Sequence, residues 1–229
     1  MISRFEQKSA SLNRFCTLQR IIMMISLFLI SAKILQAGDR FIMRFPDVHD
    51  TKVVFVYGDD IWKASTSGGI AQRLTIHDGA EQYPQFSPDG KQIAFTGEYD
   101  GNADVYVMNE FGGDIKRLTF YPGYDRVVGW HPIENKILFS SMRHSYENFS
   151  KLFMISPDGT GLEELTIHEA CQGSYSPDGK RFAFNKINRE QRTWKRYKGG
   201  MAQDIYIIDF STLKEKQITT FEGTDRIPM

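Results

Sequence analysis

Short apolar runs alternate with turn-forming residues along most of the chain. Runs such as Val53–Tyr57 and Ile93–Thr96 are each followed by a second apolar run and then by a turn that contains glycine. Apolar runs of this length between Gly, Pro, Asp and Ser are typical of β-strands. No segment past residue 40 has a sustained helical period of hydrophobic residues. The pattern therefore predicts an all-β fold.

The predicted strands come in repeated groups of four. An aromatic residue stands at Phe86, Trp130 and Tyr175, spaced by 44 and 45 residues, and a proline follows two positions later each time. The next strand of each group is predicted at Val53–Tyr57, Ile93–Thr96, Ile137–Ser140 and Phe182–Asn185. Third strands are predicted to begin at Asp60, Asp104, Lys151 and Asp204, and closing strands to cover Arg73–Thr75, Arg117–Thr119, Glu164–Thr166 and Gln217–Thr219.

Four-stranded units of 40 to 45 residues are the signature of β-propeller blades. We expect a partial propeller over residues 38–229, with blades at about 43–80, 81–122, 123–170 and 171–222. Residues 223–229 align with 123–129 and are predicted to start another blade. This alignment favours a piece of a longer protein. The alternatives are a simple tail or the completion of an early blade by circular closure.

The first 37 residues differ from the rest in composition. A basic leader with Arg4, Lys8, Arg14 and Arg20 precedes the uncharged run 21–32, and a small residue stands at Ala37. A basic start, a short apolar run and a small residue are typical of a secretory signal peptide. An uncleaved N-terminal anchor, or true initiation at residue 23 or 24, remains the alternative. The prediction is an exported protein, periplasmic or secreted from a bacterial envelope.

The charge balance and the number of cysteines argue against several classes of function. The chain has 28 basic and 28 acidic residues. Five of the basic residues and one of the acidic residues lie in the first 37, which leaves 23 basic and 27 acidic residues. An acidic balance argues against nucleic-acid binding. Only Cys171 lies after the leader, since Cys16 is within it, so we expect no internal disulfide and no cysteine zinc site.

Motifs for catalysis or for metal binding are weak. The five histidines form no HxH or HxxxH pair, and no G-x-S-x-G nucleophile motif occurs. Residues Asp100–Asp104 resemble the start of a calcium loop, but Val105 stands where such a loop needs glycine. A hairpin turn is the simpler interpretation. We therefore predict no catalytic residue, no metal and no cofactor in this chain.

A basic and aromatic stretch in the fourth unit is the candidate binding site. It combines side chains that are common at binding hot spots with glycines that permit a tight return to the next strand. The residues are Trp194, Lys195, Arg196, Tyr197, Lys198, Gly199 and Gly200. A solvated long loop is the plainer interpretation of this charge run.

The repeat Tyr83–Thr119 resembles the blades shared by TolB, the tricorn protease and related exported peptidases. The opening Phe45–Trp62 and the insertion Thr193–Gly200 are similar to tricorn-type proteins in particular. This resemblance implies the first four blades of a six-bladed N-terminal propeller. It also implies that the propeller controls the access of peptides to a distant serine protease domain, which this chain lacks.

Two functions follow from the resemblance. The first is a non-catalytic propeller fragment that gates or docks peptides for a serine peptidase and contacts the remaining domains of that longer protein. The alternative is a TolB-like module that binds an envelope protein and carries out no chemistry. The insertion at 193–200 favours the first.

Overall fold

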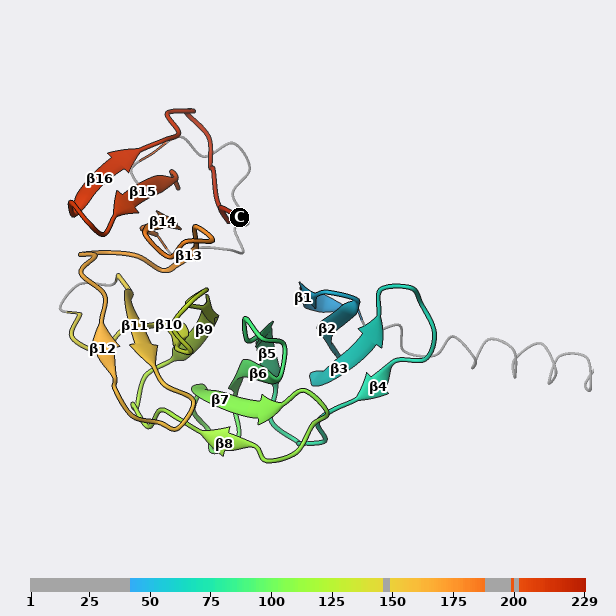
Figure 1. The fold of residues 1–229 in the computed structure, drawn as a ribbon. Coiled ribbons are helices and arrows are strands. Elements are labelled where there is room, and N and C mark those ends of the chain that lie inside the picture. The colour runs from blue at the N-terminus through green and yellow to red at the C-terminus, as the bar shows by residue number, and fades with distance from the viewer. Residues whose placement is uncertain (1–41, 146–148, 188–198, 200–201) are drawn as a thin grey trace, which may run out of the picture. The chain divides into compact units, whose positions relative to one another are not determined.

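In the part of the chain that the structure describes, sixteen β-strands form four antiparallel sheets of four strands each (Figure 1). The structure, a computed structural model, describes residues 42–145, 149–187, 199 and 202–229. Within these residues no helix is found. The all-β propeller fold predicted from the sequence is confirmed.

Each sheet takes its strands from one continuous stretch of chain. The first two sheets contain β1 (Arg44–His49), β2 (Lys52–Tyr57), β3 (Asp60–Ser65) and β4 (Gln72–Arg73), then β5 (Glu81–Phe86), β6 (Gln92–Gly97), β7 (Asp104–Asn109) and β8 (Lys116–Arg117). The last two contain β9 (Asp125–Trp130), β10 (Ile137–Ser141), β11 (Lys151–Ile155) and β12 (Glu163–Glu164), then β13 (Gln172–Tyr175), β14 (Arg181–Asn185), β15 (Tyr206–Asp209) and β16 (Lys214–Gln217). We call these four sheets blades 1 to 4.

Strands within each blade follow one another in simple order. The order is β1-β2-β3-β4 in blade 1 and has the same up-and-down pattern in the other three. The first strands β1, β5, β9 and β13 therefore each form one edge of a sheet. They also contact each other in series, β1 with β5, β5 with β9 and β9 with β13.

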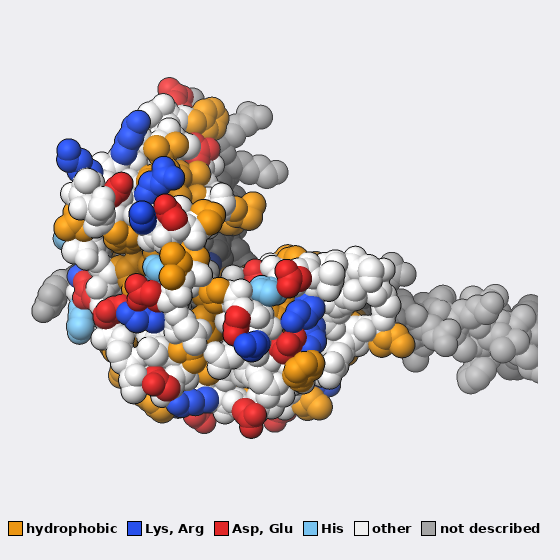
Figure 2. All heavy atoms as spheres, viewed as in Figure 1, with side chains coloured by type: hydrophobic (Ala, Val, Ile, Leu, Met, Phe, Trp, Pro, Cys, Tyr) orange, Lys and Arg blue, Asp and Glu red, His pale blue; other side chains and the backbone are white. Residues whose placement is uncertain are grey.

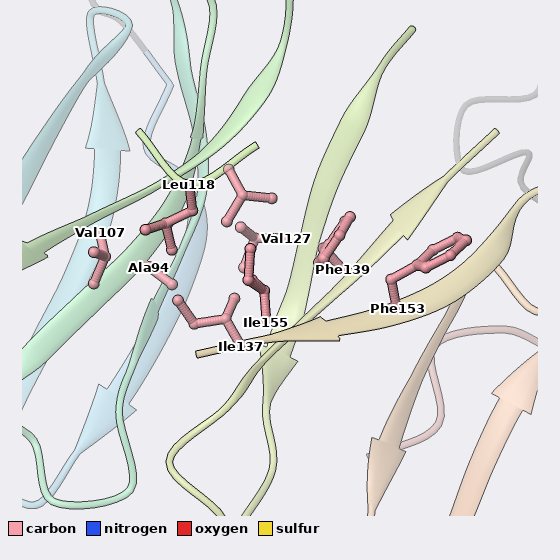
Figure 3. Close-up of a cluster of buried hydrophobic side chains, with 9 residues drawn as sticks. Ala94, Val107, Leu118, Val127, Ile137, Phe139, Phe153 and Ile155 are labelled. Atoms are coloured by element: carbon pink, nitrogen blue, oxygen red, sulfur yellow. The ribbon is translucent and has the colours of Figure 1, made fainter. Parts of the chain in front are cut away.

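Three apolar layers hold neighbouring blades together. The layer between blades 2 and 3 contains Ala94, Val107 and Leu118 on one side and Ile137 and Phe139 on the other. Figure 3 shows these side chains packed side by side. Equivalent layers join blades 1 and 2 and blades 3 and 4. The blades stack face to face because a four-stranded sheet cannot bury both of its faces alone.

Alternation along the middle strands explains how one sheet serves two layers. In β6, Ile93 and Phe95 enter the layer toward blade 1, whereas Ala94 enters the layer toward blade 3. In β10, Phe139 faces blade 2 and Leu138 faces blade 4. Side chains alternate between the two faces of a strand, so a continuous apolar run is needed where both faces are buried.

The closing strands differ from those predicted. They end at Arg73, Arg117, Glu164 and Gln217, before the Leu-Thr or Ile-Thr pairs that the prediction included. In blades 1 and 2 the threonine that follows the closing strand caps the third strand with its side chain. The N–H of Ile61 donates to the Thr75 hydroxyl at 2.9 Å, and the N–H of Val105 donates to Thr119 at 2.9 Å. In blade 4, the third strand also begins later than predicted, at Tyr206 instead of Asp204.

A buried carboxyl group links blades 1 and 2. Glu81, the first residue of β5, is fully buried. Its carboxylate accepts a hydrogen bond from the N–H of Ile61 at 3.0 Å, another from the hydroxyl of Tyr99 at 2.6 Å, and a third from Thr75. Burial raises the pKa of Glu81, and these hydrogen bonds only partly offset that effect.

Replacing Glu81 by glutamine is expected to flatten the pH dependence of stability. A carboxyl whose pKa is raised on folding stabilises the fold most below its unfolded pKa, and that contribution is lost as the pH rises through the folded pKa. Glutamine cannot ionise, so the Glu81→Gln variant should gain stability relative to the native protein as the pH rises. Urea unfolding midpoints from about pH 4 to pH 8 measure this difference.

The matched control is Glu134→Gln. A hydrogen bond from Lys136 lowers the pKa of Glu134, so its effect should have the opposite sign, and it should be small because the side chain is half exposed. If the urea unfolding midpoints of Glu81→Gln and of the native protein changed with pH in parallel, the buried carboxyl would not be a source of the pH dependence of stability.

Candidate functional site

The predicted binding stretch falls almost wholly outside the described residues. Trp194, Lys195, Arg196, Tyr197, Lys198 and Gly200 are not described, and neither is the predicted leader 1–37. Gly199 is described and exposed, and its carbonyl accepts a hydrogen bond from the N–H of Ala202 at 2.7 Å. The binding role of this stretch stays a prediction.

The points where this stretch leaves and rejoins blade 4 are well defined. The side-chain amide of Gln203, which is 1% exposed, donates to the carbonyl of Ile187. Lys186 pairs with Glu215 at 2.5 Å and lies over the ring of Tyr206, 4.3 Å from its centroid. These contacts border a cavity of about 250 Å³.

A second cavity, of about 330 Å³, lies where the first strands of the four blades meet. It is lined by Phe45, Pro46, Tyr83, Gln85, Arg126, Val127, Val128, Gln172, Gly173, Ile227 and Pro228. We call it the inner-strand pocket. Propeller blades surround a central channel, and the first strand is the edge nearest to it. The pocket therefore lies on the edge of the blades that faces the channel in a closed propeller.

The backbone at this pocket is strained in a repeated way. Phe45 and Tyr83 have φ angles of 52°, and Ile227 has 58°. Each is followed by a proline, and the registers of β1 and β5 shift at these points. Bulky residues rarely adopt positive φ, and bulges re-aim side chains beside functional sites. Strain kept at equivalent positions supports a functional role for this edge.

A polar network crosses the pocket from blade 2 to blade 4. The guanidinium carbon of Arg126 lies 4.1 Å from the ring centroid of Tyr83. The same guanidinium donates to the side-chain oxygen of Gln172 at 3.3 Å. Gln172 donates to Asn185 at 3.4 Å, and the N–H of Ile227 donates to Asn185 at 2.9 Å.

Sequence reasoning did not select Tyr83, Arg126 or Gln172. One signal for this site was visible, since a bulky residue precedes proline at Phe45-Pro46, Tyr83-Pro84 and Ile227-Pro228. The contacts across blades were not visible, because Tyr83, Arg126 and Gln172 lie more than 40 residues apart in the chain.

Three of the five histidines pack against other groups of the fold, whereas the side chains of His144 and His168 are 70% and 89% exposed. The ring of His77 lies 3.9 Å from that of Tyr99, and the ring of His131 lies 4.7 Å from that of Tyr175. His49 contacts the carbonyl of Pro88 at 3.1 Å. Among the described residues, no group of three or more His, Cys, Asp or Glu is arranged to hold a metal ion. The described residues that line the inner-strand pocket include the aromatic side chains of Phe45 and Tyr83 and the basic side chain of Arg126.

The visible surface carries both signs of charge. On the face shown in Figure 2, basic and acidic side chains are interspersed among exposed apolar ones and form no single large patch. Within the described part of the chain, no helix is long and apolar enough to cross a membrane.

Four stacked up-and-down blades with a pocket at their inner edge place the chain in the β-propeller fold class. Residues 40–229 match the family described as the tricorn protease N-terminal beta propeller domain. The chain belongs to this family. The resemblance seen in the sequence is thereby confirmed.

Several relatives are much larger than this chain, whereas the putative tricorn-like protease N-terminal subunit of Sulfurisphaera tokodaii, 25% identical over 167 residues, is covered to 84% of its length. The tricorn protease of Thermoplasma acidophilum is 28% identical over 172 residues, which cover 71% of this chain and 16% of that protein. The chain thus spans about a sixth of that relative.

Two solved structures show the same fold. The crystal structure of the tricorn protease superposes with a TM-score of 0.70 at 25% identity, covering 80% of this chain and 19% of that one. TolB from Acinetobacter baumannii superposes with a TM-score of 0.64 at 22% identity, covering 81% and 46%. The TolB likeness shows the fold alone.

Proposed function

We propose that this chain is a non-catalytic propeller that docks and gates peptides for the serine protease domain of a tricorn-like peptidase. The observation that carries the proposal is the inner-strand pocket on a propeller of the tricorn family. The described residues that line the pocket supply aromatic and apolar surfaces and one basic side chain, which suit the binding of a peptide chain. Residues 194–200 would add a second contact for the peptide or for a neighbouring domain.

The location of the protein forms part of the proposal. The basic leader and apolar run of residues 1–37 support export to the bacterial envelope. An antibody against residues 38–229 would test both the size and the location of the native gene product in envelope fractions. We expect a band several times heavier than 26.4 kDa, because the tricorn relative is about six times longer than the matched stretch.

Removal of residues 193–200 from the native gene product is expected to lower the hydrolysis of long peptides by roughly tenfold, the effect of losing about 1.4 kcal/mol of binding free energy. Hydrolysis of a two- or three-residue substrate should be unchanged, because such a substrate does not need docking. The measurement is kcat/KM for both substrate lengths. An equal loss for both lengths would contradict a docking role.

The alternative is a TolB-like module that binds an envelope protein. The Tyr83–Thr119 repeat and the shared fold support it. A native gene product close to the mass of this chain, without peptidase activity, would favour this function over the first.

A further inference from the structure

We propose that the cavity of about 250 Å³ beside blade 4 binds an arginine side chain of a peptide, and that Asp204 is the carboxylate that pairs with its guanidinium. We call this space the blade 4 cavity. The inference rests on the proposed function and deepens it, since it names a class of peptide that this propeller would accept. It is carried by an ion pair that the first three blades form and that blade 4 does not.

Two positions of the repeat, thirteen residues apart, form an ion pair in each of the first three blades. The pairs are Asp60 with Arg73 at 2.5 Å, Asp104 with Arg117 at 2.6 Å and Lys151 with Glu164 at 2.6 Å. Blade 4 has Asp204 and Gln217 at these positions. The acidic residue of blades 1 and 2 is therefore kept, whereas their arginine is replaced by a neutral residue.

Gln217 keeps one contact of the arginine that it replaces, but it supplies no charge. Its side-chain amide donates to the carbonyl of Thr219 at 2.8 Å, as the guanidinium of Arg117 donates to the carbonyl of Thr119 at 3.0 Å. The carboxylate of Asp204 accepts a long hydrogen bond from the Thr219 hydroxyl at 3.5 Å, and it pairs with no cation among the residues that the structure describes. Asp204 lines the blade 4 cavity, so a cation bound there would lie beside it.

A second oxygen in the wall of the cavity also has no partner. Gln203 lines the cavity and is 1% exposed. Its side-chain nitrogen donates to the carbonyl of Ile187, but its Oε1 accepts no hydrogen bond within the described part of the chain. Buried polar atoms almost always have a hydrogen-bond partner, because burial without one is costly. The Oε1 atom of Gln203 therefore indicates that the cavity receives a hydrogen-bond donor.

The charges around the cavity favour a positively charged ligand. Glu169 adds a second carboxylate to the lining. It lies 3.7 Å from Nδ1 of His168, which is 89% exposed, and a pair so exposed is weak. Lys186 is the one basic side chain among the described residues that line the cavity, and Glu215 pairs with it at 2.5 Å. Since Glu215 balances the charge of Lys186, the two carboxylates give the cavity a negative charge.

An arginine side chain fits these groups better than a lysine side chain does. A guanidinium has five N–H donors in one plane, so it can serve several oxygen acceptors at once. It also stacks on aromatic rings, and the rings of Phe149 and Tyr206 line the cavity. The equivalent carboxylates of blades 1 and 2 each accept a hydrogen bond from a guanidinium.

Three labelled peptides of about twelve residues test the proposal with the full 229-residue chain. All are acetylated and amidated, and they differ only at one central position among apolar residues. The first has arginine there, the second has citrulline, which has the shape of arginine but a neutral urea group, and the third has lysine. Fluorescence anisotropy gives Kd for each peptide with the native chain and with three variants, Asp204→Asn, Gln217→Arg and Thr212→Arg.

Gln217→Arg restores from within the chain the ion pair of blades 1 and 2. It should therefore compete with the peptide for Asp204, and it should raise the urea unfolding midpoint. Thr212→Arg is the matched control, because it adds the same charge at an exposed position in the turn before β16, whereas Gln217 is the last residue of that strand. Circular dichroism shows whether each variant is folded. Gln217→Arg serves as the test variant if Asp204→Asn does not fold.

We expect the arginine peptide to bind the native chain at least about tenfold more tightly than the citrulline peptide, with the lysine peptide between them. Asp204→Asn and Gln217→Arg should each abolish this preference, and Thr212→Arg should keep it.

Equal binding of the arginine and citrulline peptides would overturn the inference and leave peptide docking intact. A folded Gln217→Arg variant that keeps the preference, or an equal loss of the preference in Thr212→Arg, would also overturn it. If the preference appeared only after removal of residues 193–200, the basic stretch of this chain would be the occupant and the inference would be wrong. If no peptide binds and removal of residues 193–200 leaves long-peptide hydrolysis unchanged, the proposed function fails as well.

Discussion

Replacing Phe139 by alanine is expected to lower the free energy of unfolding by about 3–5 kcal/mol. Phe139 is fully buried in β10, in the layer between blades 2 and 3. Its ring stacks on that of Phe153 at 5.7 Å with an interplanar angle of 27°. The loss combines the transfer free energy of the ring with the cavity that it leaves, because two packed sheets cannot close up around the gap.

The control for this prediction is Phe221→Ala. Phe221 is 71% exposed, so its removal should change stability by less than about 0.5 kcal/mol. Urea unfolding followed by circular dichroism measures both variants. Equal effects at the two positions would show that the layer between the blades contributes little to the stability of the chain.

Replacing Arg117 by methionine is expected to lower the free energy of unfolding by about 3 kcal/mol, because it leaves a buried carboxylate without its positively charged partner. Arg117 contacts Asp104 at 2.6 Å, and the Asp104 side chain is fully buried. Arg117 also contacts Asp100 at 2.8 Å and donates to the carbonyl of Thr119 at 3.0 Å. Adding Asp104→Asn to this variant should restore part of the stability, because a neutral amide in that site does not need a cation. A double variant no more stable than Arg117→Met would contradict this explanation.

Blade 3 supplies a control in which the charges are reversed. Lys151 and Glu164 occupy the positions of Asp104 and Arg117 in the repeat and pair at 2.6 Å. Both side chains are partly exposed, at 24% and 32%. Glu164→Met should therefore cost less than about 1 kcal/mol. The two pairs occupy the same positions of the repeat and differ in how deeply they are buried. Comparing Glu164→Met with Arg117→Met therefore tests whether burial of the ion pair causes the large loss of stability.

The strands of each blade could be predicted because the residue patterns that indicate them are local in the sequence. Continuous apolar runs and Pro-Asp-Gly turns are patterns of neighbouring residues, so the second strands were predicted to within one or two residues. The closing strands were predicted too far toward the C-terminus. The side chains of Thr75 and Thr119 replace backbone partners there, and a strand propensity does not report such a cap.

The sequence by itself determined the four-stranded repeat and its family, because period, turn residues and spacing are properties of a linear chain. Only the tertiary structure decided where the pocket lies and which groups meet in it. Tyr83, Arg126 and Gln172 belong to three different blades and meet because face-to-face stacking brings the first strands together. Neighbours across a blade interface are set by packing, which no local pattern of residues encodes.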